Sequence, residues 1–379
     1  MHSRSSEGGT AHETVGPPRG AMMAALPPLR DGLSLGEGYH SPRVDVAVRL
    51  NVNESPLGPP RGWVEEVAEA LGAIDFNRYP DRSALGLREA IGACHGVGPE
   101  QVFAAKGSNE VLQSLLLAFG GPGRVVATFE PTYMLHSHIA RVTGTAVVSG
   151  GRRGDFRMDL DEVERVTAEY EPVITFVCSP NNPTGGAEPR DTIEKIVGIA
   201  HGLVVVDEAY GQFAPWSALE MVSGGTEGVV VVRTFSKTWA MAACRLGYLV
   251  AAPDVVRACE EVVLPYHLDA FTQVAGRLAL DHIDEMNRRV AMVVEERGRL
   301  AAALSVLDVD QWPSDSNFIL FRPRSVGAST VWQQLVERSI LVRNCDTWPG
   351  LSGCLRVTVG TPGENEEFLV ALTGILASR

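Results

Sequence analysis

From about residue 60 the chain alternates between segments with a helical spacing of apolar residues and short runs rich in valine and isoleucine. Short runs that are apolar on both faces are typical of strands in a buried parallel sheet. The expected strands are, in chain order, VFAAK, RVVATF, TAVVS, VITFVCS, LVVVDE, VVVVRTF and LGYLVA. Helical segments such as EVLQSLLLAFG and TIEKIVGIAHG separate them. The pattern predicts an α/β domain over residues 60–265, with a mostly parallel sheet covered by helices on both faces.

The pattern changes after residue 265. A long helical stretch is expected from Thr272 to Leu304, followed by the strand FILFR, a helix around VWQQLVERS, the strands ILVR and LRVTVG, and a final helix. This order predicts a smaller α+β domain over residues 266–379. The segment 31–59 is expected to join it, with the stretch Val46–Leu50 adding to its sheet. Residues 1–30 are polar and rich in Gly, Ser and Pro, which predicts a disordered tail.

Composition narrows the class of protein. Of the 379 residues, 45% are hydrophobic and 21% charged, which is typical of a soluble globular protein with a sizeable core. The formal net charge of −13 argues against nucleic acid as a partner, and no apolar run approaches the length of a membrane span. Six cysteines are scattered singly, which favours reduced thiols in the cytoplasm over a disulfide framework.

Polar residues follow several of the expected strands, and in parallel α/β sheets ligands gather at the carboxyl ends of strands. Gly107 and Ser108 open a helix, whose start either binds a phosphate or is an ordinary N-cap. Asn181 and Asn182 lie in PNNPTG, which by itself is most often a turn. Asp207 ends LVVVDE, where a buried carboxylate either serves a ligand or needs a structural partner.

The most unusual strand end is VVVVRTF, because Lys237 follows it and Arg245 comes eight residues later. A lysine at a strand end can be an amine nucleophile when desolvation lowers its pKa. Thr234, Ser236 and Arg245, with the helix start at Ser108, would form a phosphate cup. Together with a deep aspartate that keeps a ring nitrogen protonated, these are the groups that pyridoxal phosphate requires.

Three motifs in a fixed order, SPNNPTG, DEAY and FSKTWAMAACRLGY, resemble those of the fold-type I pyridoxal-phosphate-dependent aminotransferases. RYPD, GSNEVLQ, EPTY and GCLRVTVGT are similar to the histidinol-phosphate aminotransferase family among them. The resemblance extends from NVNESPLGPP at residue 51 to RVTVGTPGENEEF near the end. It implies a transfer of the amino group from histidinol phosphate to 2-oxoglutarate in histidine biosynthesis, in a ping-pong cycle through a Schiff base with Lys237.

The resemblance also implies roles for individual residues at matching positions. Lys237 would hold the cofactor covalently and move protons, and Asp207 would pair with the pyridine nitrogen. Tyr79 of RYPD would reach the cofactor phosphate from a partner subunit, which implies a homodimer. Arg356, with Arg343 as a second candidate, would bind the anionic group of the substrate. The remaining implied cofactor contacts are Tyr210 and Asn182 at the phenolic oxygen, Tyr133 on the ring face, and Gly107, Ser108, Asn109, Thr234, Ser236 and Arg245 at the phosphate.

Other readings keep the same core motifs. Ser55 stands where many family members have Asn or Tyr, so an aromatic amino-acid aminotransferase is one alternative for the donor. A decarboxylase or lyase of a phosphorylated amino acid is another, because substrate orientation selects the bond that breaks. A transcription regulator with an aminotransferase-like ligand sensor would need a DNA-binding module, and the residues before the domain have no helix-turn-helix pattern.

Three further features are expected to be structural. His136 and His138 are two residues apart on a helix and diverge, so no metal site is expected. The sequence GGPGR at residues 120–124 predicts a turn before a strand rather than a phosphate loop. Trp312 and Trp348 are expected to pack rather than to stack on a ligand, although Trp348 lies in a loop that leads to Arg356.

Overall fold

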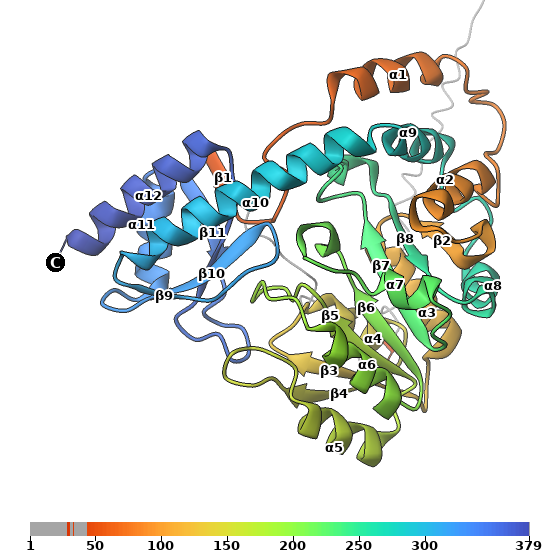
Figure 1. The fold of residues 1–379 in the computed structure, drawn as a ribbon, viewed down its shortest axis with the longest axis horizontal. Helices are drawn as coiled ribbons and strands as arrows, with labels where there is room; N and C mark the ends of the chain where they lie inside the picture. The colour runs from red at the N-terminus through yellow and green to blue at the C-terminus, as the bar shows by residue number, and fades with distance from the viewer. Residues whose placement is uncertain (1–28, 31–32, 34–43, 379) are drawn as a thin grey trace, which may run out of the picture.

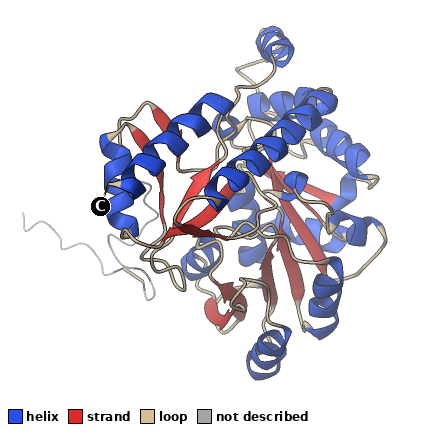
Figure 2. Cartoon of the chain, turned by 60° about the vertical axis from the view of Figure 1, so that its left-hand side comes forward, coloured by secondary structure: helices blue, strands red, loops and turns tan. Residues whose placement is uncertain are grey.

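The computed structural model describes residues 29–30, 33 and 44–378, so residues 1–28 of the expected tail lie outside the described part of the chain. Two lobes, each built around a β-sheet, make up the described part (Figures 1 and 2). Helix α10 (Ile283–Ser305) runs between the lobes and packs on both.

The sheet of the larger lobe has the strand order β2-β8-β7-β6-β5-β3-β4. Strand β8 pairs antiparallel with β2 and β7, and the other neighbours pair in parallel. The strands are β2 (Val102–Ala105), β3 (Val125–Glu130), β4 (Ala146–Gly151), β5 (Ile174–Cys178), β6 (Leu203–Asp207), β7 (Val229–Thr234) and β8 (Gly247–Val250). The mostly parallel α/β sheet that the valine-rich runs predict is therefore confirmed.

Both faces of this sheet are buried, which explains why its strands are apolar without alternation. Val229 and Val231 of β7 lie in one core, and Val230 and Val232 lie in the core on the opposite face. The first core is covered by α1 (Arg61–Leu71), α2 (Leu85–His95), α5 (Leu160–Tyr170), α6 (Arg190–Ile199), α7 (Leu219–Ser223) and α9 (Ala270–Leu280). The second core is covered by α3 (Ser108–Phe119), α4 (Leu135–Val142) and α8 (Pro253–Val262).

The sheet of the smaller lobe has the order β1-β11-β12-β10-β9. Strand β1 (Val48–Leu50) pairs in parallel with β11 (Ile340–Asn344), so the expected return of the early segment to this sheet is confirmed. The other pairs are antiparallel. The remaining elements are β9 (Val309–Gln311), β10 (Phe318–Pro323), α11 (Ala328–Glu337), β12 (Leu355–Thr358) and α12 (Pro362–Ala377).

The expected helix from Thr272 to Leu304 is wrong in one respect, because it is two helices, α9 and α10, separated by Asp281 and His282. Helix α9 packs in the larger core through Ala275 and Ala279, whereas α10 must cross to the smaller lobe, so one straight helix could not follow both directions. Met286 still belongs to the larger core and Val293 to the smaller. The packing favours a boundary within α10 rather than at residue 266, and the division into domains stays a proposal.

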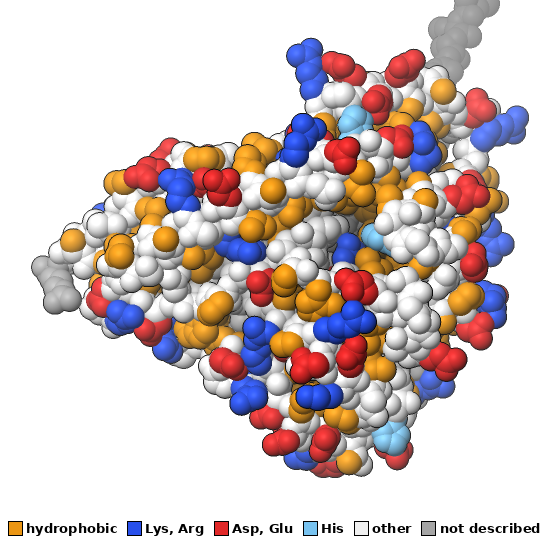
Figure 3. All heavy atoms as spheres, in the orientation of Figure 1, with side chains coloured by type: hydrophobic (Ala, Val, Ile, Leu, Met, Phe, Trp, Pro, Cys, Tyr) orange, Lys and Arg blue, Asp and Glu red, His pale blue; other side chains and the backbone are white. Residues whose placement is uncertain are grey.

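The surface shows no dominant charge on the face in Figure 3, where acidic and basic side chains are interspersed. Of the helices that the structure describes, none is both long and apolar enough to span a bilayer.

Candidate active site

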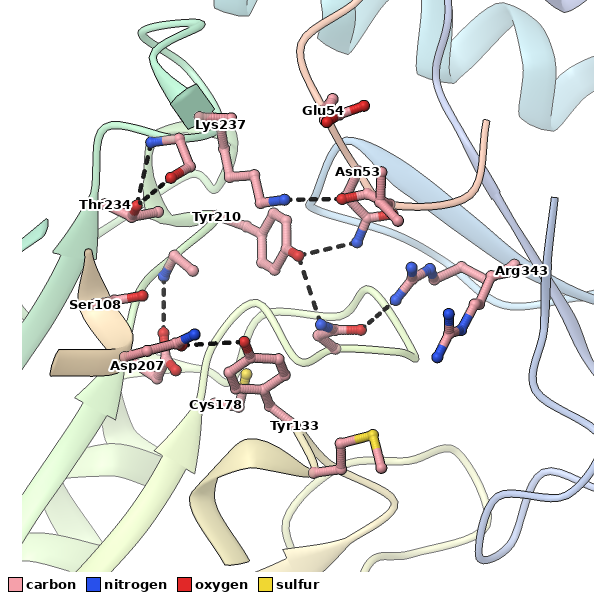
Figure 4. Close-up of a pocket in the computed structure, with 18 of the residues that line it drawn as sticks. Asn53, Glu54, Ser108, Tyr133, Cys178, Asp207, Tyr210, Thr234, Lys237 and Arg343 are labelled. Carbon is pink, nitrogen blue, oxygen red and sulfur yellow. Dashed lines mark hydrogen bonds between the residues drawn. The ribbon is translucent and has the colours of Figure 1, made fainter. Parts of the chain in front are cut away.

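A cavity of about 320 Å³ lies where the two lobes meet, at the carboxyl ends of β5, β6 and β7 (Figure 4). Its size is that of a small-ligand pocket. These ends are adjacent because Cys178 is in register with Asp207, and Asp207 with Val232. The cavity brings together most of the predicted site residues, namely Ser108, Asn109, Tyr133, Asn182, Asp207, Tyr210, Thr234, Ser236, Lys237, Arg245, Arg343 and Arg356.

Lys237 reaches into this cavity from the loop after β7, and its Nζ donates a hydrogen bond to the carbonyl oxygen of Val52 at 2.9 Å. The pKa of Lys237 is lowered to about 7, chiefly because burial removes water from the amine. The cationic neighbours Arg356 and Arg245 also lower this pKa, while Glu54 acts in the opposite direction. Near neutral pH a large fraction of the amine is therefore uncharged and nucleophilic.

Asp207 ends β6 and is only 1% exposed. Its Oδ2 lies 2.9 Å from Nε2 of His136, and its Oδ1 accepts a hydrogen bond from the backbone N–H of Ala209 at 3.0 Å. The His136 ring is itself fully buried and stacks on Phe176, with centroids 4.6 Å apart. These contacts fix the carboxylate at the cavity wall and supply the partner that a buried charge requires.

His136 is a site residue that sequence reasoning missed. His136 and His138 together do not suit a metal, but the contact of His136 is with Asp207, 71 residues away. One available signal is its position three residues after Tyr133 of EPTY, a cavity residue. The backbone N–H of His136 donates to the carbonyl oxygen of Tyr133 at 3.0 Å, and the two rings make an edge contact at 5.4 Å. Among the described residues, no group of three or more His, Cys, Asp and Glu is placed to hold a metal.

The hydroxyl oxygen of Tyr210 accepts hydrogen bonds from two asparagine side chains. Asn53 Nδ2 donates to this oxygen at 2.9 Å, and Asn182 Nδ2 donates to it at 3.5 Å. Burial raises the pKa of Tyr210 to about 12, although Arg356 and the bond from Asn53 oppose the shift. Asn53 was not among the predicted site residues. It comes from the segment after β1, is anchored to Thr358 of β12, and so belongs to the smaller lobe.

An anion cradle lies on the opposite wall, where α3 begins. The first N–H groups of an α-helix lack partners in a preceding turn, and Ser108 and Asn109 at this helix start line the cavity together with Ser236 and Arg245. Gly107 precedes the helix with φ +81°, and a Cβ at this position would lie 2.6 Å from Nη2 of Arg245. Thr234 donates to Ser236 at 3.0 Å. The glycine thus lets a guanidinium lie against the helix start, as a phosphate site needs.

Two more arginines enter the cavity from the smaller lobe. Arg343 of β11 and Arg356 of β12 are cross-strand partners and are 8% and 4% exposed. Arg356 donates to the side-chain oxygen of Asn182 and, at 2.9 Å, to the carbonyl oxygen of Asn51. In Figure 4 the cradle residues Ser108 and Thr234 and the side chain of Arg343 lie on opposite sides of the cavity. The site can therefore bind two separate anionic groups.

The packing role expected for Trp348 is only part of what the structure shows. It does pack on a small cluster around Leu320, but it also borders the cavity, with the guanidinium carbon of Arg343 5.2 Å from its ring centroid. Trp312 packs on the same cluster and has Arg322 at 5.5 Å, but it lines a different pocket. The GGPGR segment forms the expected turn before β3.

Three other residues lie outside the cavity lining. Tyr79 is 79% exposed and stacks on Tyr266, with centroids 4.4 Å apart. Ser55 turns its hydroxyl to the carbonyl oxygen of Leu57 at 2.9 Å. Glu208 forms a buried ion pair with Arg233 at 2.7 Å, which makes it a structural neighbour of Asp207 rather than part of the site.

The groups required by pyridoxal phosphate fit this arrangement. The cradle at Arg245 suits the phosphate, the buried carboxylate of Asp207 suits a protonated ring nitrogen, and Lys237 supplies an amine whose lowered pKa suits covalent capture. The phosphate cradle at Arg245 is separate from the Arg343–Arg356 pair, so a cofactor and an anionic substrate can be bound at the same time.

Comparison with known proteins agrees with the site. The family model described as aminotransferase class I and II matches residues 45–372. The chain is 42% identical to a histidinol-phosphate aminotransferase of Corynebacterium efficiens (92% of this chain, 95% of the relative) and 45% identical to one of Frankia casuarinae (91% and 89%). A crystal structure of the Sinorhizobium meliloti histidinol-phosphate aminotransferase with pyridoxal-5'-phosphate has the same fold, with a TM-score of 0.81 and 22% identity over 88% of this chain and 91% of that one. This chain belongs to the class I and II aminotransferase family.

Proposed function

We propose that the protein is a pyridoxal-phosphate-dependent aminotransferase that takes the amino group of histidinol phosphate and passes it to a 2-oxo acid, 2-oxoglutarate, in histidine biosynthesis. The observation that carries the proposal is Lys237, an amine with a pKa of about 7 at a strand end, set in one cavity with Asp207 and an anion cradle. Relatives at 41–45% identity that bear the name histidinol-phosphate aminotransferase support the choice of donor.

The cofactor would be held by residues of the larger lobe. Ser108, Asn109, Thr234, Ser236 and Arg245 would hold its phosphate, with Gly107 making room for the guanidinium. Asp207, oriented by His136, would hold a proton on the ring nitrogen. Tyr210 and Asn182 would bond the phenolic oxygen, with Asn53 as a third polar neighbour, and Tyr133 would cover the ring face. When bound, pyridoxal phosphate supplies an aldehyde that captures amines and a ring that accepts an electron pair.

Lys237 would serve as both base and acid. Its Nζ is uncharged in a large fraction of molecules near neutral pH, so it can accept a proton from the substrate carbon and later return it to a neighbouring atom. Burial, together with Arg356 and Arg245, keeps the pKa of this amine low, which favours repeated exchange of the proton at physiological pH. The Nζ atom lies 5.8 Å from the centroid of the buried Tyr210 ring, which limits water on that side of the amine.

The donor would be recognised from the smaller lobe. Histidinol phosphate carries a phosphate and no carboxylate, so its binding depends on guanidinium groups, which grip phosphate and carboxylate alike. Arg356 and Arg343 lie in neighbouring strands at the cavity and would bind the donor phosphate in one half-reaction and the oxo-acid carboxylate in the other. An aromatic aminotransferase or a decarboxylase is less well supported, because the relatives cited above bear a different name.

We also place the enzyme in a homodimer. Tyr79 is not in the cavity lining of its own chain, and it forms an exposed aromatic pair with Tyr266, beside Leu264, which is 79% exposed. Exposed aromatic and aliphatic side chains of this kind are typical of subunit contacts. In the dimer Tyr79 would reach the cofactor phosphate of the partner subunit. The six cysteines, all free thiols, favour the cytoplasm.

The donor assignment is tested by steady-state kinetics with histidinol phosphate, phenylalanine, tyrosine, glutamate and threonine phosphate, each with 2-oxoglutarate. We expect histidinol phosphate to have the highest kcat/KM. A tenfold advantage for phenylalanine or tyrosine would replace it with an aromatic donor, and release of CO₂ from threonine phosphate would favour a decarboxylase.

A further inference from the structure

The loop between β11 and β12 is built to hold one large side chain at the cavity. Cys345, Leu351 and Cys354 are buried together with Leu320 and anchor the loop. The backbone N–H of Trp348 donates to Cys345 at 2.9 Å, and that of Leu351 donates to Trp348 at 3.1 Å. The backbone N–H of Cys345 donates a hydrogen bond to the carbonyl oxygen of Cys354 at 3.1 Å. These bonds fix the backbone at Trp348, and its half-buried indole packs on the same cluster.

The indole covers an arginine that the proposed function assigns to the substrate. The guanidinium of Arg343 lies 5.2 Å from the centroid of the Trp348 ring, within the range of a cation–π contact. A guanidinium held over one ring face has fewer directions open to it, which matters because bidentate binding of phosphate needs its N–H groups to face the ligand. Arg356, its cross-strand partner, is oriented separately by Asn182 and Asn51.

The same loop also touches the larger lobe beside Tyr133. Gly350 has φ +72°, and a Cβ built on it would lie 3.5 Å from the ring of Pro131. Pro131 and Tyr133 belong to the segment after β3, so the Trp348 loop and the segment that carries Tyr133 meet at the cavity. A side chain on this loop can contact a donor bound between the two lobes.

We propose that Trp348 is a specificity-determining residue that orients Arg343 toward the phosphate of the amino donor, so that the enzyme prefers phosphorylated donors. The inference rests on the proposed function and deepens it. A purely structural role would affect all donors equally, because packing of the loop does not depend on which donor is present. A role through Arg343 affects the phosphorylated donor selectively.

The test compares histidinol phosphate with histidinol, which lacks only the phosphate, in the wild-type holoenzyme and in Trp348→Leu. We expect Trp348→Leu to lower the ratio of the two kcat/KM values by about tenfold, through the KM for histidinol phosphate, with kcat within about twofold. Trp348→Phe, which keeps a π face, should restore the ratio to within about threefold of wild type. Trp312→Leu is the matched control, because Trp312 packs on the same cluster and under another arginine, and it should leave the ratio unchanged.

A double-mutant cycle tests whether the effect passes through Arg343. If Trp348 acts by orienting Arg343, adding Trp348→Leu to Arg343→Gln should change the ratio by less than about twofold. Additive effects, or equal losses for both donors in Trp348→Leu, would overturn the inference. Should Trp348→Leu not fold, Trp348→Met carries the same comparison, since methionine fills the space without a π face. The wild-type ratio itself tests the proposed function separately: no preference for the phosphorylated donor would contradict the donor assignment, whatever the variants do.

Discussion

Asp207 and Glu208 are adjacent carboxylates, and their different partners give one a place in the site and the other a structural role. Both are almost fully buried, and both are paired. Asp207 pairs with a histidine at the cavity wall, whereas Glu208 pairs with Arg233 and with the backbone N–H of Ala218, away from the cavity. The cost of burying Asp207 is thus offset by His136, which leaves the carboxylate available to a ligand. The cost of burying Glu208 is offset by its ion pair with Arg233, away from the cavity.

We expect Asp207→Asn to lower kcat by at least ~10²-fold, about 3 kcal/mol, because an amide cannot hold the ring nitrogen in its charged form. The matched control is Glu208→Gln. It should instead lower the free energy of unfolding by roughly 3–5 kcal/mol, since it leaves Arg233 buried without its charge partner, while kcat of the folded protein changes less than about threefold. Kinetics and denaturant unfolding of both variants measure this. An intact kcat in Asp207→Asn would make that carboxylate merely structural.

The lowered pKa of Lys237 predicts a pH dependence. A lysine whose pKa falls from 10.5 to about 7 becomes uncharged above pH 7, and only the uncharged amine captures an aldehyde. The rate at which the cofactor-free protein takes up pyridoxal phosphate should therefore rise about tenfold from pH 6 to pH 8 and then level off. Stopped-flow absorbance measures this rate. A rise that continues without a plateau to pH 10 would mean that the amine keeps its ordinary pKa.

At the element scale, the anion cradle depends on how closely α3, β8 and Arg245 approach one another. Gly107 permits this approach because it has no Cβ and adopts a positive φ. A Cβ on Gly247 of β8 would likewise lie 2.2 Å from the backbone nitrogen of Ser108. The backbone of β8 thus lies against the helix start, and the Arg245 guanidinium lies against Gly107, which brings the three parts of the cradle together.

Gly107→Ala should raise the Kd for pyridoxal phosphate at least ~10-fold, because the new Cβ displaces the Arg245 guanidinium that would bind the phosphate. Gly96→Ala is a suitable control. Gly96 also has a positive φ, +67°, and its replacement should cost ~1 kcal/mol of stability, but a Cβ there meets nothing within 4 Å. Equilibrium dialysis and thermal unfolding separate the two effects. Equal cofactor affinity in both variants would rule out the cradle at Gly107.

Elements with a local signal could be predicted from the sequence, and contacts between distant elements could not. The valine runs of β6 and β7 predict buried strands, and the polar residues that follow them predict Asp207 and Lys237 at one sheet edge. The contact of His136 with Asp207 depends on how α4 packs behind β5, which no local pattern encodes. The break between α9 and α10 at Asp281–His282 contains no Gly or Pro that would mark it in the sequence. It follows from the different directions of the two helices, which depend on packing between distant elements.

At the scale of the whole molecule, the site joins two lobes. Lys237 and the cradle come from the larger lobe, whereas Asn53, Arg343 and Arg356 come from the smaller one, so the site is complete only when the lobes are packed together. In the proposed dimer a third contribution comes from Tyr79 of the partner subunit. The exposed Tyr79–Tyr266 pair on each subunit would then be covered.

We expect light scattering to give twice the mass of one chain. The Tyr79→Phe variant should remain dimeric, but its Kd for pyridoxal phosphate should rise about tenfold, because one hydrogen bond to a charged phosphate is lost. Tyr170→Phe, an exposed tyrosine on α5, should change neither property. At limiting cofactor, mixed dimers of Tyr79→Phe with Lys237→Ala should be more active than either variant, since one of their two sites has both natural residues. If mixing restores no activity, Tyr79 does not act across the interface.

The proposed function depends on Lys237 carrying the cofactor, and this is measured most directly by borohydride reduction of the holoenzyme followed by peptide mass spectrometry. We expect one pyridoxyl group per chain, on the peptide that contains Lys237, and none in the Lys237→Ala variant. Lys106 and Lys195, which lie outside the cavity lining, should stay unmodified and serve as internal controls. A pyridoxyl group on another lysine, or a Lys237→Ala variant that transaminates at the wild-type rate, would contradict the proposed function.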